Sequence, residues 1–471
     1  MKNNIKQQSV YLIVFVMTLF LNSTKLTAQC WQQIVTPSYN QGLHSAGIQQ
    51  DGSLWCWGFN YYGQLGDGTT TNRLVPTRVG TDTDWAIVAL GINATYAIKQ
   101  NGTLWAWGSN SNGQLSDGTL LGRLLPTQVL PGTTWQKISA GENFVVAQKN
   151  DGTLWSCGNK DLSQTGQAGG GGGDSLILTQ ISTATDWVTI KCQFSHTLLL
   201  KSNQTVWGFG SGDLGKLATG TDAGYGVPTQ LLAGTDWVQA TAGANLSFFK
   251  KINGTIWGCG QNGNGNLGLG NYTIGVYSLT QIGTANDWRS VEPSNLHTMA
   301  LKNNGSLWSC GYNLQGQLGN GTTITTNVLA QVGSSTDWAK VRCGRNHTLA
   351  LTTAGTLWAW GENQYGQLGD GTTTNRTTPT QIGSVCTLGV NEFTPKVMRL
   401  LNNPVEDVVQ LSFAYDGVKQ ITVYNTQGQP VLTRTVSQDF TSLEVSSLAL
   451  GVYFIQCQSE IGNQTVKMVK R

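Results

Sequence analysis

The chain has 471 residues, more than one hydrophobic core usually organises, so several domains or an array of repeats are expected. It contains 60 glycines and 17 tryptophans, whereas only 11% of its residues are charged, against roughly 25% in typical soluble domains. This composition, with many short apolar runs, indicates β-structure closed by turns and argues against a mainly helical fold.

Residues 1–28 are expected to be a signal peptide. Two lysines precede an apolar run from Val10 to Leu21, and small polar residues follow up to Ala28. The run has the length of a signal h-region and is too short to span a bilayer, so we expect cleavage after Ala28 or Gln29. In a lipoprotein interpretation Cys30 would be acylated, but Gln29 stands where a small residue is needed. No integral membrane segment is expected in the mature chain.

The mature chain is expected to be neutral. Removing residues 1–28 takes away three lysines and no acid, which leaves 25 basic and 25 acidic residues. A nucleic-acid binder needs a positive field that collects phosphates, so this balance argues against a nucleic-acid partner.

A unit of about fifty residues then recurs seven times. Each unit opens with a tryptophan, usually preceded by Asp, and continues through a Gly-containing turn, a second strand, a (D/N)-G turn and (T/S)-L-W-x-x-G. The opening tryptophans are Trp31, Trp85, Trp135, Trp187, Trp237, Trp288 and Trp338, and a second series is Trp55, Trp105, Trp155, Trp207, Trp257, Trp308 and Trp358. The fullest copies end in N-x-x-G-Q-L-G-D-G-T and P-T-x-(I/V).

These units predict an all-β fold, a seven-bladed β-propeller over residues 30–386. Three or four short antiparallel strands per unit cannot cover both faces of their own sheet, and radial packing of seven sheets buries each against its neighbours. An open solenoid would need atypical polar end repeats, whereas the first and last units are as regular as the others.

The L-W-x-W-G, N-x-x-G-Q-L-G and P-T-x-(I/V) elements resemble those of the regulator of chromosome condensation repeat family, from Trp31 to Ile382. The resemblance implies the propeller fold. It implies no single function, because the family includes nucleotide-exchange factors for small GTPases, ubiquitin-ligase modules and secreted bacterial enzyme inhibitors. Exchange activity would require a cytosolic GTPase, which an exported chain does not meet.

Comparison of the seven units distinguishes residues that build the fold from residues that could carry out chemistry. All 17 tryptophans fall at three repeat positions, which favours packing over an aromatic ligand cage. Each histidine stands eleven residues before a second-series tryptophan, where other units hold Ala94, Phe144 and Leu246. The histidines are His44, His196, His297 and His347. A position that accepts Ala or Phe favours packing over metal ligation or general-base chemistry.

The acidic residues give no catalytic or metal site either. Three Asp-Gly pairs suggest calcium, but the equivalent positions of other units hold Thr, Leu or Asn, which favours a turn. The pairs start at Asp67, Asp117 and Asp370. A chance pair of acids for glycoside hydrolysis, such as Glu142 with an acid of a neighbouring blade, remains open. We expect no catalytic residue, metal or cofactor.

Most cysteines are expected to be buried thiols, although cross-strand disulfides also fit. Cys30 and Cys386 differ from the rest. Cys30 precedes Trp31, and Cys386 lies two places before position 388, where an eighth opening tryptophan would fall. In a closed ring the two residues come within disulfide reach, roughly 4.4–6.8 Å between Cα atoms. We expect a Cys30–Cys386 disulfide that closes the ring.

A linker over 387–395 and a small β-sandwich over 396–471 follow. The last segment contains N-P-V-E-D at 403–407, I-T-V-Y-N at 421–425, L-A-L-G-V-Y at 448–453 and a basic end. It resembles the type A C-terminal sorting domain of the type IX secretion system. The resemblance implies export across the outer membrane of a Gram-negative bacterium by that machinery, removal of the domain, and a released or surface-attached product. An ordinary adhesive sandwich is the alternative.

The variable residues lie in turns. The turn after the first strand of each unit carries a different side chain, and five of these form our candidate recognition rim: Ile92, Glu142, Phe194, Asn295 and Arg345. A fixed frame with diverse turns suits recognition of a macromolecule. The leading hypothesis is a secreted or surface scaffold that binds an extracellular protein or glycan through one propeller face. The alternatives are a secreted polysaccharide hydrolase and a purely structural surface module.

Overall fold

The computed structural model describes residues 30–471 except 40–41, 169–172, 384–397, 414–418, 438–439 and 460–461. The predicted signal peptide and linker therefore lie outside the described residues. Seven four-stranded antiparallel sheets follow one another along the chain, each built from consecutive strands, as the repeat predicts. Within the described residues, no helix is long and apolar enough to cross a membrane.

The strands of the blades repeat in a fixed order. The first strands are β1 (Trp31–Val35), β5 (Trp85–Leu90), β9 (Trp135–Ala140), β13 (Trp187–Gln193), β17 (Trp237–Ala242), β21 (Trp288–Pro293) and β25 (Trp338–Cys343). The second strands are β2 (His44–Gln49), β6 (Ala94–Lys99), β10 (Phe144–Lys149), β14 (His196–Lys201), β18 (Leu246–Lys251), β22 (His297–Lys302) and β26 (His347–Thr352). The third strands are β3 (Leu54–Gly58), β7 (Leu104–Gly108), β11 (Leu154–Gly158), β15 (Val206–Gly210), β19 (Ile256–Gln261), β23 (Leu307–Gly311) and β27 (Leu357–Gly361). The outer strands are β4 (Arg73–Arg78), β8 (Arg123–Val129), β12 (Ser175–Ser182), β16 (Tyr225–Leu232), β20 (Gly275–Gln281), β24 (Thr326–Gln331) and β28 (Arg376–Ile382), and a short 3₁₀ helix spans Asp213–Gly215.

An ion pair that lies over two tryptophan rings explains why Asp precedes the opening tryptophan of most units. In the sixth blade Lys302, at the end of β22, lies over the rings of Trp288 (5.0 Å) and Trp308 (4.8 Å). Its ammonium also pairs with Asp287 at 3.0 Å. The same arrangement recurs in other blades, so one lysine fixes the starts of two strands.

The G-Q-L-G motif joins each blade to the next. The carbonyl oxygen of Gln64 accepts hydrogen bonds from Trp107 Nε1 (3.1 Å) and Thr95 Oγ1 (2.7 Å) of the second blade. Gln367 of the last blade accepts in the same way from Trp57 Nε1 (3.0 Å) and Ser45 Oγ (2.9 Å) of the first. The ring therefore closes through the same contacts that join its other blades.

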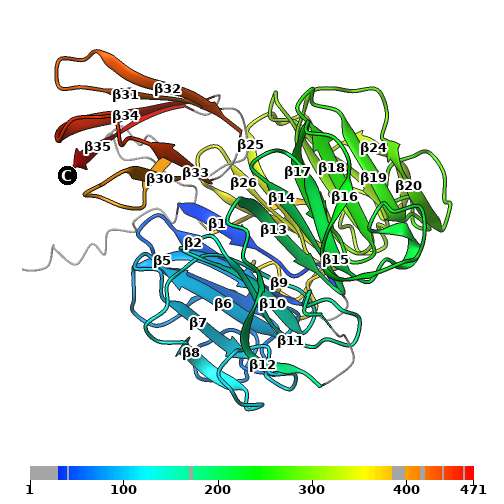
Figure 1. The fold of residues 1–471 in the computed structure, drawn as a ribbon. Helices are drawn as coiled ribbons and strands as arrows, with labels where there is room; N and C mark the ends of the chain where they lie inside the picture. The colour runs from blue at the N-terminus through cyan, green and yellow to red at the C-terminus, as the bar shows by residue number, and fades with distance from the viewer. Residues whose placement is uncertain are drawn as a thin grey trace, which may run out of the picture.

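A small two-sheet domain follows the propeller. One sheet contains β29 (Met398–Leu400), β30 (Val408–Phe413) and β33 (Phe440–Glu444). The other contains β31 (Lys419–Tyr424), β32 (Pro430–Val436), β34 (Gly451–Ser459) and β35 (Gly462–Lys470). Buried Val409, Leu411, Ile421 and Ile455 pack between them, which matches the predicted sandwich. Figure 1 shows this domain at the end of the propeller where β1 begins, and Arg399 donates there to Gln32 Oε1 at 3.0 Å.

Candidate functional site

The predicted recognition rim lies at one end of the ring, where first strands lead into second strands. We call this end the turn face. Ile92 and Asn295 are only 6% and 8% exposed there, and Glu142, Phe194 and Arg345 are half-buried. The rim is more enclosed than the sequence suggested, because neighbouring turns pair through their backbones. The amide of Glu142 donates to the carbonyl of Phe194 at 3.2 Å, and that of Ile92 to the carbonyl of Glu142 at 3.5 Å. The side chains of Ile92 and Asn295 therefore have little surface to offer a partner.

A long first-blade loop crosses the turn face. It runs through residues 36–43, whereas residues 91–93 suffice in the second blade. Ser38 Oγ donates to Gln193 of the fourth blade, and the carbonyl of Ser38 accepts from the amide of Asn295 in the sixth at 3.1 Å. The ring of Tyr39 stacks on Phe194 with centroids 3.9 Å apart. Ser38 and Tyr39 thus reach from the first blade to the fourth and sixth blades across the turn face.

An aromatic cluster lies on the turn face where the first and last blades meet. Phe59 contacts Tyr365 (ring centroids 5.1 Å apart), Tyr61 and Tyr62 (6.4 Å each), and Tyr61 contacts Tyr62 at 5.1 Å. Tyr61 is 68% exposed and Tyr62 39%. We call these four residues the aromatic cluster. The sequence analysis missed it because, among the aromatic residues, tryptophans alone were compared between units.

The repeat itself does not require these aromatic residues. The positions equivalent to Phe59 hold Ser109, Asn159, Ser211, Gln261, Tyr312 and Glu362. The positions equivalent to Tyr61 hold Ser111, Asp161, Asp213, Gly263, Leu314 and Gln364. Since small or polar residues stand at these two positions in five of the six other blades, the sixth having Tyr312 and Leu314, the frame does not require Phe59 and Tyr61.

The fourth blade buries a lysine where other blades have an amide. Lys216 replaces the Gln of G-Q-L-G, and its side chain is completely buried. Its ammonium donates to Ser195 Oγ (3.1 Å) and Asn245 Oδ1 (3.3 Å), and the nearest acid, Asp213, is 3.8 Å away. Burial lowers the pKa of Lys216 to about 8, although Asp213 opposes the shift. Comparison of the seven G-Q-L-G copies in the sequence would have revealed this lysine.

Replacing this lysine by the repeat's own residue is expected to stabilise the protein. Below pH 8 the ammonium is charged in both the folded and the unfolded chain, so the native state carries the full cost of burying it. Lys216→Gln should therefore raise the unfolding free energy by about 2–3 kcal/mol at pH 7. Between pH 8 and 10.5 the folded chain releases the proton first, so the wild type should approach the variant. Urea unfolding at pH 7 and pH 10 tests both effects, and a less stable variant at pH 7 would contradict them.

The four histidines link blades. His44, His196, His297 and His347 are fully buried, and each Nε2 lies 3.0–3.3 Å from a Ser or Thr hydroxyl of the next blade. Burial lowers the pKa of His297 to about 3, with a smaller effect of His347. A neutral, fully buried imidazole with a hydroxyl partner in the next blade is a packing element, in keeping with the repeat analysis.

The aspartates of the Asp-Gly pairs hold their own loops. Asp67 receives hydrogen bonds from Thr69 and pairs with Arg73 at 2.6 Å, and Asp117 and Asp370 have equivalent partners. Burial alone would raise the pKa of Asp67, but the hydrogen bonds of Thr69 and Arg73 lower it. In the described part of the chain no group of three or more His, Cys, Asp and Glu side chains is arranged to hold a metal. Glu142 is the acid that the sequence left open for glycoside hydrolysis, and burial raises the pKa of its carboxyl group.

The cysteines divide into two classes. Cys56, Cys157, Cys192, Cys259, Cys310, Cys343 and Cys457 are buried free thiols. Burial raises the pKa of Cys157 to about 12, so this thiol is not a reactive one. Cys30 is disulfide-bonded. Its predicted partner, Cys386, lies outside the described residues, so the pairing stays a prediction.

Comparison with known proteins follows the two-part architecture. A model of the RCC1-like domain matches residues 22–323, and regulator of chromosome condensation (RCC1) repeats match 304–351, 338–367 and 354–412. The secretion system C-terminal sorting domain matches residues 402–471. This domain indicates a secreted protein or one on the outer surface of a Gram-negative bacterium, and it implies interaction with the secretion machinery.

Solved structures support the fold. Human WBSCR16 is 21% identical, with a TM-score of 0.64 over 70% of this chain and 94% of its own. Yeast RCC1 (Prp20), solved with Kap60, is 18% identical, with a TM-score of 0.63 over 71% of this chain and 84% of its own. At these identities the likeness extends to the fold alone. Because the RCC1-like model covers more than half of its residues, the chain belongs to the RCC1-like domain family.

Proposed function

We propose that this protein is a binding scaffold of the cell exterior that recognises an extracellular glycan or protein through its turn face and catalyses no reaction. The aromatic cluster is the observation that carries this proposal. Tyr61 and Tyr62 expose their rings, and no other blade has an aromatic residue at the position of Tyr61. Rigid rings with a polar tip give contact area at low entropic cost, for sugar rings as for protein side chains.

The surroundings of the aromatic cluster favour binding over hydrolysis. The buried histidines and the aspartates of the Asp-Gly pairs are already engaged in holding the frame. Phe59 contacts both exposed tyrosines and also Tyr365 of the last blade, so the cluster spans the seam between the first and last blades. A rigid aromatic surface is a typical centre of a recognition interface.

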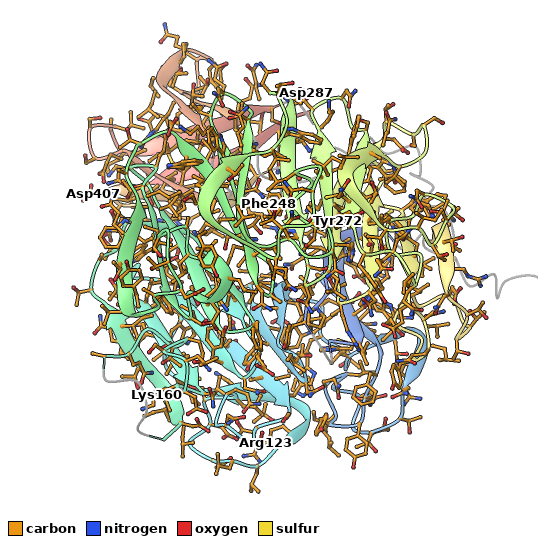
Figure 2. All side chains as sticks on the ribbon, turned by 90° about the vertical axis from the view of Figure 1, so that its right-hand side faces the viewer. Arg123, Lys160, Phe248, Tyr272, Asp287 and Asp407 are labelled. Carbon is orange, nitrogen blue, oxygen red and sulfur yellow. The ribbon has the colours of Figure 1, made fainter. Side chains whose placement is uncertain are left out.

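Removing both exposed rings is expected to weaken binding at least tenfold. The test is a glycan array, together with purified surface proteins, probed with the wild type and the double variant Tyr61→Ala/Tyr62→Ala. Central aromatic anchors contribute about 2 kcal/mol or more, which exceeds a factor of ten. Tyr272→Ala is the matched control, because Tyr272 is 52% exposed but stands in the fifth blade outside the cluster (Figure 2).

Three outcomes would contradict this proposal. Equal affinity of the double variant and the wild type would remove the aromatic cluster from recognition. New reducing ends in a bound polysaccharide would favour the hydrolase. Failure to bind any glycan or surface protein would favour a purely structural module.

A further inference from the structure

The four buried histidines are distributed unevenly around the ring. His297, His347 and His44 stand in consecutive blades, the sixth, the seventh and the first, whereas His196 stands alone in the fourth. The first three therefore line three successive junctions from the sixth blade to the second, including the seam. We call these three residues, with the junctions that they line, the histidine arc. The equivalent positions of the other three blades hold Ala94, Phe144 and Leu246.

Hydrogen bonds determine which nitrogen of each imidazole carries the proton. The hydroxyl of Thr95 donates its single proton to the carbonyl of Gln64 at 2.7 Å, so it accepts from His44 Nε2 at 3.3 Å. The hydroxyls of Ser45 and Thr348 are engaged in the same way at the other two junctions of the arc. Each neutral histidine of the arc therefore carries its proton on Nε2.

A second proton would bind Nδ1, where the surroundings do not accept a hydrogen bond. The Nδ1 atoms of His44 and His347 are buried and have no hydrogen-bond partner within the described residues. Nδ1 of His297 lies 2.9 Å from Ser294 Oγ. This hydroxyl already accepts from the amides of Leu296 and His297, so its own proton points at Nδ1. A charged imidazole would thus be buried with an N–H that is unpaired or faces another donor, which is costly.

The charged groups that act on the histidines also oppose protonation. Burial, with a smaller contribution from His347, lowers the pKa of His44 and of His297 to about 3, and burial lowers that of His347 to about 3. Burial and then Lys216 lower the pKa of His196. A histidine of the unfolded chain titrates near pH 6.5. Between pH 6.5 and 3 the unfolded chain therefore binds protons that the folded chain does not, and stability falls as the pH falls.

We propose that the histidine arc is an acid-sensitive closure, which opens the ring between the sixth and the second blade when the surroundings become acidic. One opening of the arc frees three histidines to bind protons, whereas separation at the junction of His196 frees one. Each further proton favours the open form, so acid acts on the arc before it acts on the other junctions. The aromatic cluster spans the seam, so this opening would also part Phe59 from Tyr365.

Urea unfolding of the full chain at pH 7 and pH 5 tests the closure. His347→Phe is the matched variant, because Phe144 packs over Gly141 as His347 packs over Gly344. A Cβ atom on these glycines would lie 1.9 Å and 2.1 Å from the respective ring. Each buried histidine should raise the unfolding equilibrium constant about twenty-fivefold between pH 7 and pH 5. The total rise should therefore be smaller by about this factor in His347→Phe, since all other groups are shared with the wild type.

Two further variants complete the test. Phe144→Leu shortens a buried side chain at the equivalent position and removes no titratable group, so its loss of stability should be the same at both pH values. His44→Leu, which copies Leu246 of the fifth blade, is a second test of the arc if His347→Phe does not fold. A folded histidine variant with the pH dependence of the wild type would overturn the acid-sensitive closure.

Hydrogen exchange locates the opening. After correction for the intrinsic exchange rate at each pH, amides of β2 and β26 should lose protection about twentyfold or more between pH 7 and pH 5, while those of β10 in the third blade keep theirs. Equal loss in all blades, or greater loss in β10, would show that the arc does not open first. These measurements use no turn-face ligand, so failure of the binding proposal would leave them unchanged, and the reverse also holds.

Discussion

Loss of the Cys30–Cys386 disulfide is expected to lower the unfolding free energy of the propeller by about 4–5 kcal/mol. The variant Cys30→Ser should show this loss in urea unfolding without reductant. The reason lies in how the ring closes. Its first and last sheets are each built from four consecutive strands, so among the described strands no sheet combines both ends of the propeller.

The contacts at this seam are those of an ordinary blade junction. The amide of Trp31 donates to Gly355 O at 2.9 Å, just as the amide of Trp135 donates to Gly102 O at 2.8 Å between the second and third blades. At every other junction the chain itself connects the two blades. At the seam this connection is missing, and we expect the predicted disulfide over so long a loop to replace it by restricting the unfolded chain.

Peptide mapping and a double variant give the controls for this prediction. Mapping without reductant should recover the segment around Cys30 joined to that around Cys386. Cys30→Ser and Cys30→Ser/Cys386→Ser should be equally unstable, and reductant should not destabilise either further, because the remaining cysteines of the described chain are free thiols. A Cys386 that maps as a free thiol would rule out the pairing.

The fold was predictable because every blade repeats the same physical solution. Two tryptophans and a glycine turn mark three strands of each unit, and radial packing is the remaining way to bury their sheets. The repeat also identified His44 and Asp67 as parts of the frame. Their partners, Thr95 in the next blade and Arg73 in the same loop, could not be read from position alone.

Departures from the repeat were harder to interpret. Trp55 follows Trp31 by 24 positions, whereas Trp105 follows Trp85 by 20, so the longer first-blade loop has a signal in the sequence. Its course across the turn face depends on long-range contacts such as that of Tyr39 with Phe194. The burial of the recognition rim depends on backbone hydrogen bonds between turns, which side-chain variability does not reveal.

No element of the repeat predicts where the sorting domain packs against the propeller. Gln32, which receives Arg399, occupies an ordinary first-strand position, and Ala86 stands at the equivalent place in the second blade. Arg289 of β21 and Arg342 of β25 are visible in the sequence, but that both line one channel depends on how the seven sheets pack.

Trp360→Ala is expected to cost about 3–5 kcal/mol of unfolding free energy. Trp360 has no exposed surface, donates from Nε1 to the carbonyl of Gln317 at 2.9 Å and packs on Trp338 with centroids 6.1 Å apart. Truncation leaves a large cavity in one junction between blades, and the carbonyl of Gln317 keeps only its hydrogen bond from Thr348 Oγ1 at 3.0 Å. Urea unfolding measures this loss.

Trp360→Phe is the matched comparison, since the fourth blade already holds Phe209, fully buried, at the equivalent position. A phenyl ring fills most of the space and forfeits the hydrogen bond, so the cost should fall to about 1–2 kcal/mol. If Trp360→Ala kept wild-type stability but lost binding of the turn-face partner, the tryptophans would act as a ligand cage. A stability loss graded by ring size, with ligand affinity unchanged in the folded variants, would show instead that the tryptophans build the frame that carries the turn face.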